Sequence, residues 1–204
     1  MRLVFASNNA HKLEEVRRIM PAGIEVLSLS DIGFEADIEE TGTTLEDNSA
    51  IKASTVAAFI VESGKWKVER LDGVFAGDTG LEIDALGGKP GVYTARWAGE
   101  PAANRKKALA ELQGETNRGA QFRTVITLIW TQESGVRNQD APLQVSGIVR
   151  GRMAEEEYGN GGFGYDPVFI PEGYDKTFGE LPAEIKNSIS HRARALQALV
   201  KVIG

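Results

Sequence analysis

The order of apolar and polar positions along the chain predicts strands interleaved with helices. Short apolar runs, and one segment where apolar residues alternate with acidic ones, are typical of strands and lie at 1–6, 73–76, 81–85, 122–130 and 167–170. Apolar residues recur at helical spacing in 12–20, 48–60, 104–112 and from about residue 190 onward. Because single strands and single helices do not alternate strictly, we expect an α/β fold with a mixed sheet.

Two polar, turn-rich stretches at 114–120 and 131–141 flank the run 122–130 and predict loops. The chain shows no internal repeat and no low-complexity linker. At 204 residues it can bury a sizeable core. We therefore expect one domain over residues 1–204, a size that also permits two lobes.

Composition narrows the classes of function. The chain has no cysteine, which excludes a disulfide framework and a thiolate nucleophile. No apolar run approaches the roughly 20 residues that span a bilayer, and the first apolar run is too short for a signal-peptide core. We therefore expect no membrane partner and a cytoplasmic protein. The net charge of −6 argues against a nucleic-acid surface, which relies on clustered Lys and Arg.

A glycine-rich run at 161–167, with the sequence G-G-F-G-Y-D-P, has the composition of a nucleotide-binding loop. Glycine lets backbone amides approach a ligand closely, and the rings of Phe163 and Tyr165 offer flat faces. Asp166 can accept hydrogen bonds from a base edge or orient a cation. The same composition also suits an ordinary tight turn before the strand at 167–170.

The N-terminal strand feeds a polar turn, Ser7-Asn8-Asn9, that opens a helix. Such a turn presents free backbone N–H groups and the positive end of the helix dipole, where an anion can bind. Ordinary helix capping explains Asn8 and Asn9 equally well, but the dipole disfavours a cation such as Lys12 in the first turn.

Asp78 follows the apolar run 73–76 and precedes Thr79 and Gly80. We expect it at a strand end, where a carboxylate beside glycines can hold Mg²⁺ or accept a proton from water. By itself the D-T-G triplet is also a serviceable turn.

Five motifs together resemble one family, the inosine/xanthosine triphosphate pyrophosphatases. They are S-N-N-A-H-K at 7–12, E-T-G-T-T-L-E-D-N-S-A-I-K-A at 40–53, D-T-G-L-E-I-D-A-L-G-G-K-P-G-V-Y-T-A-R-W-A-G at 78–99, G-G-F-G-Y-D-P at 161–167 and K-N-S-I-S-H-R at 186–192. They occur in the family's order and span almost the whole chain. The set is far more specific than any single motif.

The resemblance implies Mg²⁺-dependent cleavage of non-standard purine triphosphates such as ITP, dITP and XTP into the monophosphate and pyrophosphate. It also implies an elongated α/β fold, with a long mixed sheet, flanking helices and two lobes around a central active-site cleft. The family usually assembles as a homodimer, so a second copy of the chain is an expected partner.

The resemblance also assigns the phosphate end of the site. The residues that would hold the triphosphate are Ser7, Asn8, Asn9, Ala10, His11, Lys12, Lys52 and Thr79. Glu40 and Asp78 match the carboxylates that gather Mg²⁺, and Asp78 also matches the proton acceptor for the attacking water. Without the resemblance, Lys52 would be assigned to a solvated helix face.

Recognition of the base falls to the C-terminal motifs in the same way. The resemblance places Phe163, Gly164, Tyr165 and Asp166 around the purine ring. Lys186, His191 and Arg192 match residues that meet the six-position oxygen of hypoxanthine and xanthine. The alternative for His191 and Arg192 is the start of a surface helix. The chain has only two histidines, and their spacing does not suit a shared metal.

Three positions depart from the family pattern. Gly77 stands where bacterial members usually have a second Asp, Asp47 replaces a usual Glu, and Glu157-Tyr158-Gly159 replaces a usual Pro-Arg-Gly. Loss of an acid at Gly77 keeps open a nucleotide-binding protein without catalysis. An enzyme for another nucleotide class, such as modified pyrimidines, is a further alternative.

Overall fold

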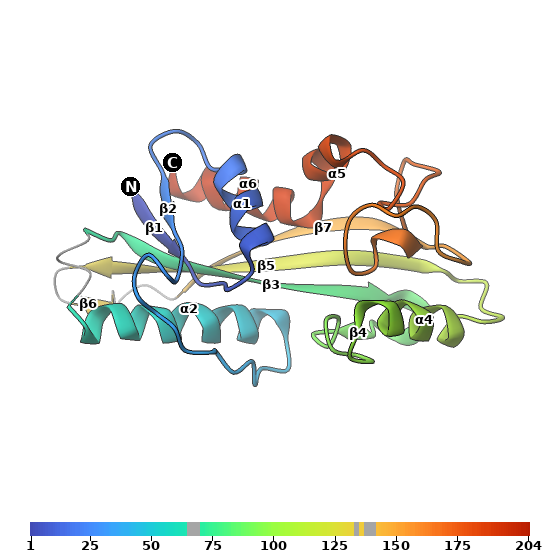
Figure 1. Cartoon of the computed structure of the whole chain (residues 1–204), viewed down its shortest axis with the longest axis horizontal. Coiled ribbons are helices and arrows are strands. Elements are labelled where there is room, and N and C mark those ends of the chain that lie inside the picture. The colour runs from blue at the N-terminus through green and yellow to red at the C-terminus, as the bar shows by residue number, and fades with distance from the viewer. Residues whose placement is uncertain (65–69, 133–134, 137–141) are drawn as a thin grey trace. The chain divides into compact units, whose positions relative to one another are not determined.

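The computed structural model describes residues 1–64, 70–132, 135–136 and 142–204 (Figure 1). Its helices are α1 (Ala10–Ile19), α2 (Leu45–Glu62), α4 (Pro101–Glu111), α5 (Ala183–Ile189) and α6 (His191–Ile203), with short 3₁₀ helices η1 (Asp84–Leu86) and η2 (Asp166–Val168). Its strands are β1 (Arg2–Phe5), β2 (Glu25–Leu27), β3 (Gly73–Ile83), β4 (Pro90–Gly91), β5 (Gly119–Gln132), β6 (Gly135–Val136), β7 (Leu143–Met153) and β8 (Phe169–Pro171).

The strands form a mixed sheet with the order β2-β1-β3-β5-β7-β8, with β4 beside β3 and β6 beside β5. Strand β1 is parallel to both β2 and β3, with Leu3 opposite Val26 and Gly73. Strands β4 and β8 run antiparallel to β3 and β7, respectively. The predicted α/β class with a mixed sheet is therefore confirmed, whereas the elongated outline and the central cleft stay predictions.

The chain forms two compact units. Unit 1 comprises Met1–Asp78, Val125–Ser146 and Ala195–Gly204, and unit 2 comprises Thr79–Thr124 and Gly147–Arg194. Elements β3, β5, β7 and α6 contribute residues to both units. One continuous strand or helix can serve two cores because its side chains meet different neighbours at its two ends.

Unit 1 packs helices on both faces of its strands (Figure 1). On one face Val4 and Val74 join Val56 and Ile60 of α2 in a single buried cluster. On the other face Leu3, Phe5 and Phe75 join Val16 of α1 and Leu196 and Leu199 of α6. This division follows from the two-residue period of a strand, which sends neighbouring side chains to opposite faces. With both faces covered, residues 3–5 of β1 and 73–76 of β3 are all apolar.

Unit 2 has one buried cluster. It contains Leu81 and Ile83 of β3, Ala108 and Leu112 at α4, and Phe122 of β5, together with Val149, Met153, Tyr165, Val168, Phe169 and Phe178. Phe169 lies edge-on to Phe122 at 4.8 Å and stacks on Phe178 at 5.5 Å, both between ring centroids. These aromatic contacts hold β8 and the segment that follows it, which contains Phe178, against β5.

Most of the predicted elements are present, but several boundaries were wrong: for example, α4 begins at Pro101 rather than Asn104, and β8 begins at Phe169 rather than Pro167. Helix α2 begins at Leu45 rather than Asn48, because the Thr44 side chain accepts a hydrogen bond from Asp47 N and caps the helix. Strand β5 includes residues 119–120 and 131–132, and β6 covers 135–136, although all of these were predicted as loop. Residues 133–134 and 137–141 of the second predicted loop lie outside the described residues. Asp78 lies in the middle of β3 rather than at a strand end.

The position of Asp78 reflects local backbone preference together with strand pairing. Thr79 is β-branched and favours extended backbone, and Gly80 is buried within the strand instead of forming a turn. Pairing with neighbouring strands thus overrides the turn propensity of the D-T-G triplet.

Within the described part of the chain, no helix is long and apolar enough to cross a membrane.

Candidate active site

The first turn of α2 positions a buried amide. Asn48 is fully buried, and its Oδ1 accepts a hydrogen bond of 2.8 Å from Gly42 N. Residue 42 has no room for a side chain, since a Cβ there would lie 2.6 Å from Asn48 Oδ1. Asn48 Nδ2 lies 3.5 Å from Asp78 Oδ2, so this amide ties the 40–44 segment to β3.

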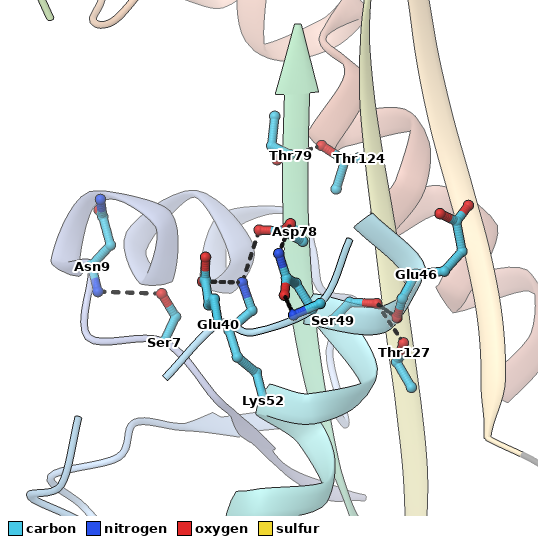
Figure 2. A network of polar contacts seen from close by, with 12 residues as sticks. Ser7, Asn9, Glu40, Glu46, Ser49, Lys52, Asp78, Thr79, Thr124 and Thr127 are labelled. Atoms are coloured by element: carbon cyan, nitrogen blue, oxygen red, sulfur yellow. Dashed lines mark hydrogen bonds and ion pairs between the residues drawn. The ribbon is translucent and has the colours of Figure 1, made fainter. Parts of the chain in front are cut away.

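One turn further along α2, Lys52 lies between two carboxylates (Figure 2). Its Nζ is 2.7 Å from Glu40 Oε1 and 2.9 Å from Asp78 Oδ1. Lys52 and Asp78 are each only 8% exposed. The solvated-helix alternative for Lys52 is therefore wrong: the ammonium is a buried cation paired with two anions.

Glu40 and Asp78 converge on one positive charge, and this bears on the predicted magnesium. Among the residues the structure describes, no group of three or more His, Cys, Asp or Glu is arranged to hold a metal ion. Mg²⁺, however, is commonly bound through one or two carboxylates together with substrate phosphates, rather than in an all-protein cage. Two carboxylate oxygens that already face one cation fit that kind of site.

The N-terminal turn supports the start of α1. Asn9 Oδ1 accepts a hydrogen bond of 3.0 Å from Lys12 N, and Asn9 N donates to Ser7 Oγ at 3.2 Å (Figure 2). Asn9 therefore caps the helix, as the capping alternative predicted. Ala10 and His11 are exposed in the first turn, together with Asn8 before it. Capping leaves the other first-turn N–H groups able to bind an anion.

In unit 2, Asp166 organises the glycine-rich loop. Its Oδ2 accepts hydrogen bonds of 2.6 Å from both Phe163 N and Lys186 Nζ. Gly162 has a φ of +75°, and a Cβ there would lie 2.7 Å from Asp166 Cγ. Glycine is thus required at this position both by backbone conformation and by the close approach of the carboxylate.

An exposed aromatic ring lies beside two cations at this loop. Phe163 is 53% exposed. Lys186 Nζ lies 4.2 Å and Arg192 Cζ lies 5.7 Å from its ring centroid. A large apolar ring that remains exposed among cations is a suitable platform for a flat, polar ligand.

The rest of the loop is anchored in unit 2. Tyr165 is buried, and its hydroxyl donates to the Thr94 carbonyl at 3.1 Å. Burial raises the pKa of Tyr165, which keeps its hydroxyl protonated as a donor. Arg105 donates to the Gly164 carbonyl at 2.9 Å. Tyr165 and Gly164 thus hold the loop in place around the exposed ring of Phe163.

His191 and Arg192 are buried, which contradicts the alternative of a surface helix start. The imidazole of His191 stacks on Phe122 at 5.0 Å between centroids, and its Nδ1 lies 2.6 Å from Thr124 Oγ1. Burial lowers the pKa of Arg192 to about 10. The guanidinium therefore stays charged at neutral pH, although it is largely withdrawn from water.

A model of the Ham1 family matches residues 3–202. A dITP/XTP pyrophosphatase of Flavobacterium johnsoniae is 45% identical over 100% of this chain and 98% of its own length. This chain belongs to the Ham1 family. A second dITP/XTP pyrophosphatase, from Bacillus subtilis, is 43% identical over 98% of this chain and 96% of its own length.

Solved Ham1 structures agree with the fold. A HAM1 protein from Coxiella burnetii has a TM-score of 0.85 and 35% identity, covering 100% of this chain and 98% of its own. The Staphylococcus aureus Ham1 protein has a TM-score of 0.83 and 37% identity with the same coverage. The predicted family and fold class are therefore confirmed.

In this Ham1-family chain the predicted residues form two groups. Unit 1 brings together Glu40, Lys52 and Asp78. Unit 2 brings together Phe163, Asp166, Lys186 and Arg192. His191 joins Phe122 and Thr124 in unit 2, whereas the contacts of Ser7, Asn9 and Lys12 described above are within their own turn.

Asn48 and Thr124 are among the residues that contact predicted site residues and were missed as candidates. Asn48 had a usable signal, because it lies four residues before Lys52 and eight before Val56, on one buried helix face. Thr124 had none, since a threonine in the apolar run 122–130 is ordinary strand composition. Only the fold shows that its hydroxyl meets His191.

The buried position of Lys52 leads to a stability prediction. Replacing Lys52 with Met removes the cation between Glu40 and Asp78 but retains the length of the side chain. We expect the free energy of unfolding to fall by about 3 kcal/mol, because removing one partner leaves buried charge uncompensated. Arg18→Met breaks an exposed pair with Glu14 and should cost less than about 1 kcal/mol. Urea unfolding measures both, and equal losses would contradict the role given to Lys52.

Proposed function

We propose that this Ham1-family chain is a nucleoside triphosphate pyrophosphatase that cleaves ITP, dITP and XTP into the monophosphate and pyrophosphate. The observation that carries the proposal is the group formed by buried Lys52 and Asp78 and partly buried Glu40, which combines two carboxylates with a cation of suitable charge for phosphate. Curated relatives from Flavobacterium johnsoniae and Bacillus subtilis are named dITP/XTP pyrophosphatases. The exposed Phe163 beside Lys186 supports a ring-shaped ligand in addition.

The phosphate chemistry follows from charge. A triphosphate carries about four negative charges near neutral pH, and attack on phosphorus requires that this charge is neutralised and a water aligned. Lys12 and Lys52 would hold the phosphates, together with the N–H groups that begin α1. Asp78 would accept a proton from the water while the water oxygen forms its bond to the α-phosphorus. The bond from that phosphorus to the α–β bridging oxygen breaks, and pyrophosphate leaves.

Magnesium is part of the proposal. Glu40 and Asp78 are the residues that would hold it, and the bound ion would neutralise phosphate charge during the displacement. Lys52 compensates the same two carboxylates through its ammonium. Gly77 would leave the ion with one acid fewer nearby than the family pattern provides.

Base recognition rests on hydrogen-bond polarity. Donors from Lys186, His191 and Arg192 would pair with a keto oxygen at position six of the purine. The amino group of adenine would place a donor against these donors, so ATP is rejected. Phe163 would stack on the ring, and Asp166 would hold Lys186 in place through its 2.6 Å ion pair.

The remaining predictions complete the proposal. We propose one functional domain over residues 1–204 with two lobes, a homodimeric assembly and a cytoplasmic location. A free nucleotide, rather than a nucleic acid or a membrane, is the proposed partner, and the net charge of −6 supports that choice.

One assay distinguishes the proposed activity from its alternatives. Pyrophosphate release is measured from ITP, XTP, GTP, ATP and dTTP, with Mg²⁺ and with excess chelator. We expect ITP and XTP to be cleaved far faster than ATP, and only with the metal. Binding of ITP without turnover would instead support a nucleotide-binding protein, and a preference for dTTP would support an enzyme of another nucleotide class.

The role of Asp78 gives a second test. Asp78→Asn keeps the shape of the side chain and leaves Lys52 paired with Glu40, so folding and nucleotide affinity should be nearly unchanged. Turnover of ITP should fall by at least about 100-fold, the usual scale for loss of a general base. Single-turnover kinetics separate the chemical step from binding. Near-normal turnover in this variant would assign the proton transfer to another group.

A third test compares the two groups of site residues. Arg192→Ala removes a donor to the base, so the ratio of ITP to ATP kcat/KM should fall by roughly ten- to a hundred-fold. Lys12→Ala removes a positive charge proposed to hold the phosphates, so it should weaken the binding of every triphosphate about equally. Steady-state kinetics on the two substrates measure both effects. If both variants leave selectivity unchanged, the division into a phosphate end and a base end is incorrect.

A further inference from the structure

Two hydroxyls, one partly and one fully buried, lead to the imidazole of His191. Thr79 Oγ1 lies 2.8 Å from Thr124 Oγ1, which in turn lies 2.6 Å from His191 Nδ1. Figure 2 shows the side chains of Thr79 on β3 and Thr124 on β5 directed toward each other. Thr124 is 2% exposed and His191 is 8% exposed, so water has little access to the hydrogen bond between them.

The number of protons restricts how these three groups can be arranged. Each hydroxyl donates one proton, and a neutral imidazole carries one proton on either Nδ1 or Nε2. If Thr79 donates to Thr124 and Thr124 donates to Nδ1, the imidazole proton lies on Nε2. If Nδ1 donates to Thr124 and Thr124 donates to Thr79, Nε2 becomes an acceptor. The direction of this chain therefore determines what the other ring nitrogen offers.

That choice has a direct consequence for purine selection. A protonated Nε2 donates a hydrogen bond and matches a keto oxygen at position six, whereas an unprotonated Nε2 accepts one and matches an amino group. The stacking of His191 on Phe122 fixes the ring plane but leaves the two nitrogens chemically undecided. The hydroxyl of Thr124, which meets Nδ1, can decide between them.

We propose that Thr124 is a positioning residue that donates its hydroxyl proton to His191 Nδ1, keeps the imidazole proton on Nε2 and thereby favours six-keto over six-amino purines. Thr79 completes the arrangement by donating to Thr124 Oγ1. The selectivity part rests on the proposed function, whereas the tautomer part can be measured without substrate.

The tautomer is measured by NMR on the whole protein. The chain has only His11 and His191, so long-range ¹H–¹⁵N spectra contain two imidazoles, and His11→Gln assigns them. We expect wild-type His191 to carry its proton on Nε2 only. Thr124→Val has nearly the same shape but no hydroxyl, and should give a mixture of the two tautomers. Thr124→Ser keeps the hydroxyl and should restore the wild-type spectrum.

The same variants test selectivity. In Thr124→Val the ratio of ITP to ATP kcat/KM should fall about three- to tenfold, the scale of one neutral hydrogen bond, and Thr124→Ser should recover it. Thr131→Val is the matched control: Thr131 is a buried residue of β5, and its hydroxyl donates to the Leu71 carbonyl instead. It should change neither the spectrum nor the ratio. Circular dichroism verifies the folding of each variant.

Each outcome decides a separate point. A wild-type proton on Nδ1, or a His191 spectrum unchanged in Thr124→Val, overturns the role of Thr124. A changed tautomer with unchanged selectivity overturns the link to purine choice. If the wild-type protein releases no pyrophosphate from ITP, the proposed function fails, and the NMR result still decides whether Thr124 orients His191.

Discussion

The ammonium of Lys52 between Glu40 and Asp78 is the interaction on which the rest of unit 1 depends. A cation in the interior is tolerated only when opposite charges accompany it, so these three side chains must be positioned together. That requirement fixes the rotation of α2 against β3 and brings the 40–44 segment to the same place. The apolar residues of α2, including Val56 and Ile60, then pack on the face of the sheet next to this charged group.

In unit 2 a buried charge is likewise accompanied by an opposite charge, but here the buried group at the centre is a carboxylate. The carboxylate of Asp166 is buried, and it is satisfied by Lys186 and by the backbone of its own loop. The loop is consequently anchored where Asp166 and Tyr165 hold it, while Phe163 remains exposed. The burial of polar groups thus determines the shape of both groups of site residues, and the apolar clusters provide the surroundings that make each unpaired charge costly.

Much of the fold could be predicted from local patterns. The helical period of α1 and α6 and the apolar runs of β1 and β5 are strong signals, because burial of one face imposes them on the sequence. Local turn signals were less reliable. Asp78 and Thr79 continue a strand because neighbouring strands pair with them, and this pairing depends on residues far away in the chain.

By itself the sequence determined the family, the α/β class with a mixed sheet, and the residue types available for chemistry, since motifs and periodicities are local properties of the chain. The tertiary structure decided which of those residues meet. Lys52 is separated by 26 residues from Asp78, and Thr124 by 67 from His191, so their contacts exist only after the sheet and helices have packed. A side chain's partners depend on distant segments, and this is why Thr124, unlike Asn48, could be recognised only in the folded chain.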